Sequence, residues 1–123
     1  MKKHWGDFVA EKVASKGELV LGIDPVLEDL PFFFKQNGTP AAKSVQDYVH
    51  FLLETTADQI GFVKYQSAFF EAFGTRGIGV LSYGIAQAKE IGLGVILDAK
   101  RGDVESTARS LCPGVSDARK RQL

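Results

Sequence analysis

One stretch of the chain organises the rest: Val95-Ile96-Leu97-Asp98-Ala99-Lys100-Arg101-Gly102-Asp103-Val104-Glu105-Ser106-Thr107. An apolar run, entered through Gly92 and Gly94, leads directly into the pattern Asp-x-Lys-x-x-Asp. A short apolar run of this kind predicts a buried strand, and such strands are typical of parallel sheets that are covered on both faces. The charged residues then fall where the strand ends, which is the edge where α/β proteins bind ligands.

The spacing of the charges fits a strand end. Side chains two residues apart on a strand point the same way, so Asp98 and Lys100 are expected to project together. Gly102 permits a sharp change of direction, Asp103 opens the following segment, and a new helix is expected from near Val104. Bringing charges this close together costs solvation free energy, which must be offset by ion pairing or by interaction with a substrate. A salt-bridged strand terminus is therefore the alternative to a functional site.

Composition limits the class of protein. The chain has 123 residues, is 45% hydrophobic and has a formal net charge of zero, which suits one soluble globular unit. Zero net charge argues against electrostatic capture of nucleic acid or of an anionic membrane. No apolar run has the length of a membrane span, no signal peptide opens the chain, and a single Cys112 fits a reducing cytoplasm. His4 and His50 lack metal-ligand spacing and are interpreted as surface or packing residues.

The first half of the chain reads as a helix, a strand and a long connection. Residues 2–16 predict an amphipathic helix that ends at Gly17 and carries Trp5, Phe8, Val9 and Val13 near helical spacing. Residues 18–25 predict a strand that closes on Asp24, because Pro25 cannot extend the ladder. The connection over 26–39 contains Phe32-Phe33-Phe34, which could be a lid or a partner surface, although packing under the end of the fold is favoured.

Two further helices and one strand precede the central stretch. Thr39-Pro40 predicts a helix start, with Thr39 as the cap and Pro40 first, and the helix reaches about Asp58. Residues 61–66 predict a strand, residues 67–74 a short helical turn, and Thr75 can cap the last helix. The expected inward side chains are Val45, Tyr48, Val49, Leu52, Leu53 and Thr56 on one helix and Ile78, Leu81, Ile85 and Ala88 on the other.

The predicted order is therefore a helix followed by β-α-β-α-β. Right-handed crossovers place all three strand ends on one side of a parallel sheet. Asp24, Lys64, Asp98 and Lys100 are then expected to converge at one rim. This convergence favours a functional rim over structural ion pairs.

Three motifs in this order resemble the orotidine 5'-phosphate decarboxylases. They are Leu21-Gly22-Ile23-Asp24-Pro25, then Val63-Lys64-Tyr65-Gln66-Ser67-Ala68-Phe69-Phe70-Glu71, then Leu97 through Thr107. They are most similar to the bacterial subfamily with an N-terminal helix and the signature Asp-Ala-Lys-Arg-Gly-Asp. The resemblance covers residues 1–108 and implies the N-terminal portion of a single (β/α)₈ TIM barrel. It also implies conversion of orotidine monophosphate to UMP and carbon dioxide in pyrimidine biosynthesis, with no metal and no cofactor.

The resemblance also implies a role for each matching residue. Lys64, Asp98, Lys100 and Asp103 would form the charged catalytic array, with Lys100 as the proton donor to C6 of the pyrimidine and Asp98 against the departing carboxylate. Asp24 and Lys64 would hydrogen-bond the ribose hydroxyls. Asp103, Val104 and Thr107 would cross a homodimer interface into the neighbouring site. Chemistry supports these roles, because loss of carbon dioxide leaves a carbanion that needs a cation and a proton donor.

Two other interpretations remain open. One is a metal-dependent enzyme of sugar phosphates from the same barrel suprafamily, but the hexulose-phosphate synthases carry an acidic residue where this chain has Lys64. The other is an inactive fragment or pseudoenzyme that acts only as a binding partner, pairing through residues 103–107. A (β/α)₈ barrel takes about 250 residues, and the family's phosphate-gripping loops come from its last strands. We therefore expect little or no activity from this truncated chain alone.

Residues 109–123 depart from the family pattern. After Ala108 the family continues with something like x-Ala-Tyr-Ala-x-Ala-Tyr-Leu, whereas Pro113-Gly114 here interrupts the expected helix. When residues 110–121 are written with suitable synonymous codons, reading from the second base gives Ala-Tyr-Ala-Gln-Ala-Tyr-Leu. We therefore hypothesise a frameshift near Arg109. Coding DNA that does not give this family pattern in the shifted frame would rule the hypothesis out.

Overall fold

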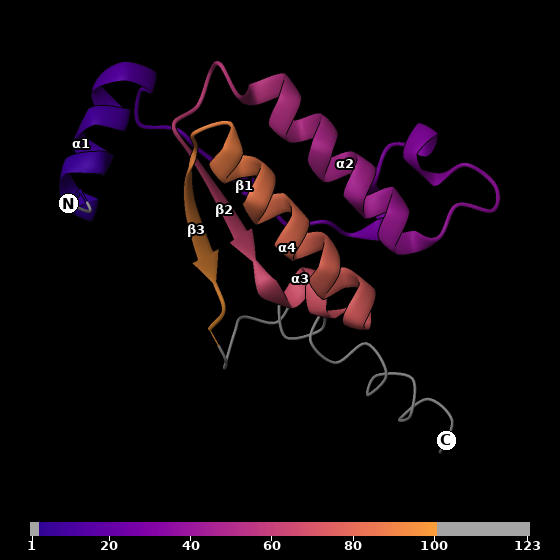
Figure 1. Ribbon diagram of the computed structural model, residues 1–123. Coiled ribbons are helices and arrows are strands. Elements are labelled where there is room, and N and C mark those ends of the chain that lie inside the picture. The colour runs from indigo at the N-terminus through magenta and orange to yellow at the C-terminus, as the bar shows by residue number, and fades with distance from the viewer. Residues whose placement is uncertain (1–2, 101–123) are drawn as a thin grey trace.

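The computed structural model describes residues 3–100, and the predicted helix near Val104 and the predicted aberrant tail lie outside this range. Figure 1 shows the elements, which follow the predicted helix-β-α-β-α-β order. In sequence they are α1 (Trp5–Lys16), β1 (Val20–Ile23), η1 (Leu27–Asp29), η2 (Phe32–Lys35), α2 (Ala41–Thr56), β2 (Phe62–Gln66), α3 (Ser67–Glu71), α4 (Gly74–Glu90) and β3 (Gly94–Asp98).

The three strands form one parallel sheet in the order β1-β2-β3. Gly22 lies opposite Lys64, which in turn lies opposite Ile96. Two residues further along, Gln66 lies opposite Asp98. Helices α2 and α4 lie side by side on one face of this sheet (Figure 1), while α1 lies apart from them, on the other side of the sheet near the N-terminal ends of β2 and β3. Parallel strands need such long connections, which the helices supply.

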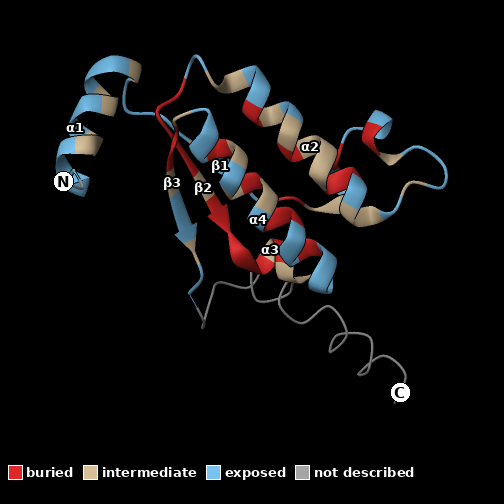
Figure 2. Ribbon diagram, viewed as in Figure 1, coloured by how far each residue is buried: buried red, intermediate tan, exposed pale blue. Residues whose placement is uncertain are grey.

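The core lies between β2 and the helix pair α2 and α4. Val63 and Tyr65 of β2 are fully buried, and the buried colour in Figure 2 follows β2, α3 and the inner sides of the two helices. The Tyr65 hydroxyl donates to the Gly84 carbonyl of α4 at 2.9 Å. A Cβ at Gly84 would lie 3.1 Å from Val49 and 3.2 Å from Tyr65, so this glycine allows the close approach of α4. The inward face predicted for α2 is confirmed by burial of Val45, Val49 and Leu53.

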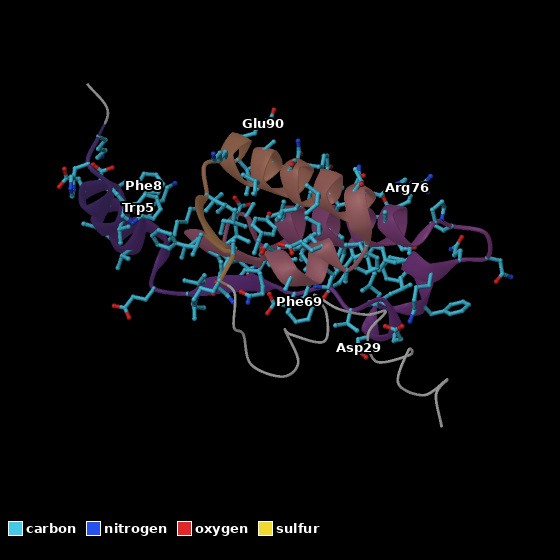
Figure 3. The ribbon with its side chains drawn as sticks, turned by 90° about the horizontal axis from the view of Figure 1, so that it is seen from below. Trp5, Phe8, Asp29, Phe69, Arg76 and Glu90 are labelled. Carbon is cyan, nitrogen blue, oxygen red and sulfur yellow. The ribbon has the colours of Figure 1, made fainter. Side chains whose placement is uncertain are left out.

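The first helix, α1, packs only lightly on the other face of the sheet. None of its residues is buried, and Trp5 is 54% exposed. Trp5 stacks on Phe8 at 5.4 Å between ring centroids, and Phe8 meets Phe62 of β2 edge-on at 6.5 Å. Figure 3 shows Trp5 and Phe8 together at one end of the molecule, far from Arg76 at the start of α4. An apolar groove of about 450 Å³ separates α1 from the sheet.

Helix starts differ from the predicted ones. Helix α1 begins at Trp5, because His4 caps it by accepting from the Gly6 N–H at 3.1 Å. Pro40 has an extended ψ of 141° and is itself the N-cap of α2, so Thr39 does not cap this helix. Helix α4 begins at Gly74, which places Thr75 inside its first turn. These starts depend on backbone angles that the residue types alone do not fix.

The predicted inward face of α4 is partly wrong. Leu81 and Ala88 are buried and Ile85 packs against the core, as expected, but Ile78 is 43% exposed. Gly77 and Val80 take the inward positions instead.

The aromatic triplet divides between core and surface. Phe34 is buried and meets Tyr48 and Phe51, both of α2, edge-on. Phe32 and Phe33 are 81% and 57% exposed. Phe33 contacts the rings of Phe34 and Phe51 with much of its own ring exposed. Packing, the favoured interpretation, therefore holds fully for Phe34, partly for Phe33 and not for Phe32.

Candidate active site

The candidate site lies on the sheet face that points away from α2 and α4. Side chains alternate along a strand, so the burial of Val63 and Tyr65 in the helix-facing core directs Lys64 to the opposite face. The same alternation directs Ile96 and Asp98 of β3 there, because Val95 packs against the core. Lys64 and Ile96 form one layer on this face of the sheet, and Asp98 lies in the next layer, toward the C-terminal ends of the strands.

Asp98 and Lys100 form the best-defined contact of the site. The Lys100 ammonium lies 2.6 Å from Oδ2 of Asp98, and the Lys100 backbone N–H donates to Oδ1 at 3.2 Å. The Asp98 side chain is 18% exposed, whereas that of Lys100 is 75% exposed. The carboxylate is therefore held at the sheet edge, beside a lysine side chain that is largely exposed.

These contacts tune the Asp98 carboxyl group. The hydrogen bond from the Lys100 side chain lowers its pKa most, the bond from the Lys100 backbone adds to this, and the Lys64 charge contributes further. Hydrogen bonds and cations favour the charged form of a carboxyl group. Asp98 is therefore ionised at neutral pH, and Lys64 and Lys100 both act on it, as the predicted convergence requires.

Asp24 lies at the level of Asp98, directly after β1, whereas Lys64 lies one layer lower on β2. Lys64 is partly buried and lies two residues before Gln66, the register partner of Asp98. Asp24 is exposed and directly follows Ile23, the partner of Tyr65, so its backbone lies level with Gln66. The structure thus brings Asp24, Lys64, Asp98 and Lys100 to the same end of the sheet.

Three predicted site residues, Asp103, Val104 and Thr107, lie outside the described residues. Their placement across an interface stays a prediction. Within residues 3–100, no group of three or more His, Cys, Asp or Glu side chains could hold a metal ion. No helix in the same range is long and apolar enough to cross a membrane.

The sequence interpretation missed two residues beside the charged array. Gln66 is only 7% exposed and lies opposite Asp98, and Gly22 lies opposite Lys64. Both belong to the motifs quoted above, but no role was predicted for either. Gln66 could have been found from the sequence, because side chains two residues apart on a strand point to the same face. Gly22 could not, because its position beside Lys64 depends on the register between β1 and β2.

Comparisons with known proteins show what the chain is similar to. No family model matches the chain. The orotidine 5'-phosphate decarboxylase of Nocardioides sp. is 37% identical over 116 residues, which are 92% of this chain and 40% of that protein. That of Salinispora arenicola is 41% identical over 102 residues, 77% of this chain and 33% of that protein.

Solved structures agree with these relatives. A Streptomyces avermitilis protein assigned as an orotidine 5'-phosphate decarboxylase matches with a TM-score of 0.65 and 31% identity, covering 88% of this chain and 37% of that one. The UMP synthase of Leishmania donovani matches with a TM-score of 0.64 and 27% identity, covering 95% and 23%.

The parallel sheet and its helix layer thus correspond to the N-terminal part of a (β/α)₈ barrel. Within that class, the chain corresponds to the N-terminal part of the orotidine 5'-phosphate decarboxylases. It spans about 40% or less of the curated relatives cited above. The family resemblance stated from the sequence is confirmed.

Proposed function

We propose that the chain carries one half of the site that decarboxylates orotidine monophosphate to UMP. The observation that carries the proposal is the Lys100–Asp98 contact, reinforced by Lys64, at the C-terminal ends of neighbouring parallel strands. Ligands of α/β barrels bind at this edge. The relatives that match this chain are named for the same reaction.

The proposed reaction breaks one carbon–carbon bond and forms one carbon–hydrogen bond. Carbon dioxide leaves the pyrimidine C6, the bonding electron pair stays on that carbon, and the Lys100 ammonium supplies the proton. A cation placed where negative charge develops stabilises the transition state. The Lys100 ammonium is suited to this role because it already lies beside a carboxylate at the sheet edge.

Asp98 raises the energy of the substrate carboxylate rather than binding it. Two like charges about 4 Å apart repel by roughly 4 kcal/mol at an effective dielectric of about 20. Enzymes commonly lower barriers by about 8–23 kcal/mol, so repulsion alone does not suffice. The remainder comes from Lys100 and from binding energy of the ribose and phosphate, which are remote from the reacting carbon.

The remaining predicted residues bind the substrate in this proposal. Asp24 and Lys64 hydrogen-bond the ribose hydroxyls. Asp103, Val104 and Thr107 come from a second copy in a homodimer. The reaction belongs to pyrimidine biosynthesis, for which we propose a cytoplasmic location.

A chimaera tests the proposal. Residues 1–100 of this chain would replace the matching segment of the Nocardioides decarboxylase, and release of carbon dioxide from carboxyl-labelled orotidine monophosphate would be measured. We expect turnover, and we expect Lys100→Ala to reduce kcat by at least about 10²-fold, in the range of general acid catalysis. Lys89→Ala, which removes an exposed lysine from the last turn of α4, is the matched control.

A chimaera that folds with the melting behaviour of its parent but does not release carbon dioxide would contradict the proposal. The 123-residue chain would be assayed beside it. We expect little or no turnover from that chain alone, and normal turnover would overturn this expectation.

A further inference from the structure

Three polar side chains at the surface of the helix pair α2 and α4 are linked by two contacts. The Tyr83 hydroxyl of α4 lies 3.1 Å from Nδ1 of His50 on α2. Nε2 of the same imidazole lies 3.2 Å from Oε1 of Glu54, four residues further along α2. The two helices lie side by side (Figure 1), so the imidazole joins a hydroxyl on one helix to a carboxylate on the other.

The partners of His50 fix which nitrogen of its neutral ring carries the proton. A carboxylate only accepts hydrogen bonds, so the contact with Glu54 requires the proton on Nε2. Nδ1 then presents its lone pair to Tyr83, whose hydroxyl donates to it. The phenolic proton therefore points at a base, and a carboxylate orients that base.

This order of groups is the arrangement that activates a side-chain nucleophile. A hydroxyl is a weak nucleophile while it keeps its proton, and an adjacent base that is oriented by a third group removes this limit. The two distances, 3.1 and 3.2 Å, lie within the reach of about 2.6–3.2 Å that such groups need. Arrangements of this kind are recognised by geometry and by the role of each group, because they recur on unrelated folds.

A small molecule can reach these groups from solvent. The side chains of His50 and Glu54 are 45% and 69% exposed, and the hydroxyl of Tyr83 is partly buried. The helices of a (β/α)₈ barrel form an outer ring around the strands. Further strands of such a barrel join at β1 and β3, the edges of the described sheet. Their helices then flank α2 and α4 and leave the junction between these two helices facing solvent.

We propose that Tyr83 is a covalent modification site, where an activated acyl donor such as an acyl phosphate or an aryl ester acylates the phenol. The Tyr83 oxygen forms a bond to the acyl carbon, and the leaving group departs from that carbon with the bonding electron pair. His50 takes the phenolic proton on Nδ1 and passes it to the leaving group, while Glu54 stabilises the charged imidazole. The site lies across the sheet from Asp98 and Lys100, so the inference is independent of the proposed function.

Acetylation of the 123-residue chain by p-nitrophenyl acetate, located by mass spectrometry of its peptides, tests the inference. Tyr48 is the internal reference, because its side chain is half-buried and packs edge-on against Phe34. General base catalysis contributes about 10²–10⁴-fold in enzymes, so Tyr83 should react at least about tenfold faster than Tyr48. Equal rates at the two tyrosines would overturn the inference.

His50→Asn removes the base and keeps a polar group beside the Tyr83 hydroxyl. Asparagine and histidine have similar helix propensities, so the variant should fold like its parent while acetylation of Tyr83 falls to the level of Tyr48. Thr55→Asn, at an exposed position of the same helix, is the matched control and should leave the rate at Tyr83 unchanged. An unchanged rate in folded His50→Asn would overturn the inference.

Tyr83→Phe identifies the nucleophile. Release of nitrophenolate that depends on His50 should disappear in this variant. If such release persists, the imidazole itself attacks the ester, and the assignment of Tyr83 as the nucleophile is overturned.

The pH profile separates a general base from a merely structural contact. The rate at Tyr83 should fall at acid pH, because a protonated imidazole does not accept the phenolic proton, and this fall should be absent in His50→Asn. Glu54 is a positioning residue, since it acts through His50. Glu54→Gln should lower the rate several-fold and displace the acid limb of the profile, because an amide does not stabilise the charged imidazole. If His50→Asn unfolds, an unchanged rate and profile in Glu54→Gln would overturn the inference.

Discussion

Lys100 holds Asp98 through two separate groups, its ammonium at 2.6 Å from Oδ2 and its backbone N–H at 3.2 Å from Oδ1. Because both donors belong to one residue two positions further along, the contact closes a tight loop directly after β3. The carboxylate is thereby fixed at the edge of the sheet. The Lys100 side chain as a whole remains 75% exposed.

Removing the ammonium should therefore raise the pKa of Asp98. In Lys100→Met the largest cause of its lowered pKa is lost, so the value should move toward the ordinary value of about 3.9. A lowered folded-state pKa contributes stability above the ordinary pKa, and this contribution is lost as pH falls through the folded-state value. An NMR titration of the Asp98 carboxyl carbon measures the shift. Lys89→Met is the control, and an unchanged Asp98 titration in Lys100→Met would contradict the assignment.

Two glycines of α4, Gly77 and Gly79, should respond to alanine in opposite directions. A Cβ at Gly77 would lie 1.9 Å from the Phe70 carbonyl oxygen, whereas one at Gly79 meets nothing within 4 Å among the described residues. Gly77→Ala should destabilise the chain by about 1–3 kcal/mol or more through overpacking. Gly79→Ala should stabilise it by up to about 1 kcal/mol through helix propensity. Urea unfolding measures both, and equal effects would show that α3 and α4 do not approach as described.

The aromatic triplet offers a matched pair of truncations. Phe34→Ala removes a buried ring that packs on α2 and should cost about 3 kcal/mol or more. Phe32→Ala removes a ring that is 81% exposed and should change the free energy of unfolding by less than about 0.5 kcal/mol. Thermal unfolding of the two variants compares them. A large loss of stability in Phe32→Ala would contradict this prediction, because it would mean that the Phe32 ring packs against a surface outside residues 3–100.

The hydroxyl of Tyr65 should contribute measurably to stability. It is buried, it donates to the Gly84 carbonyl, and burial raises its pKa above the ordinary range, so it stays a neutral donor. Tyr65→Phe should cost about 0.5–1.5 kcal/mol, the usual net value of such a bond. Tyr83→Phe, which removes a partly buried hydroxyl 3.1 Å from Nδ1 of His50, should cost less. A smaller loss in Tyr65→Phe than in Tyr83→Phe, measured by urea unfolding, would contradict the ranking.

Much of the fold could be predicted because its signals are local. Apolar runs bounded by glycine or proline gave the three strands, and helical spacing gave α2 with Val45, Val49 and Leu53 inward. The rim followed from one rule of topology, since right-handed crossovers bring parallel strand ends together. Ile78 was misplaced because several rotations of α4 satisfy a helical pattern. The close contact of Gly77 with Phe70 selects the observed one.

The sequence by itself determined the order of the elements, the parallel sheet and the set of charged residues at its edge, because periodicity and strand ends are properties of neighbouring residues. Only the tertiary structure decided which groups touch. It joined both donors of Lys100 to Asp98, placed Gly22 beside Lys64, and brought Tyr83 of α4 to His50 of α2. The physical reason is that strand register and side-chain packing depend on contacts between segments far apart in the chain. A pattern of neighbouring residues does not specify those contacts.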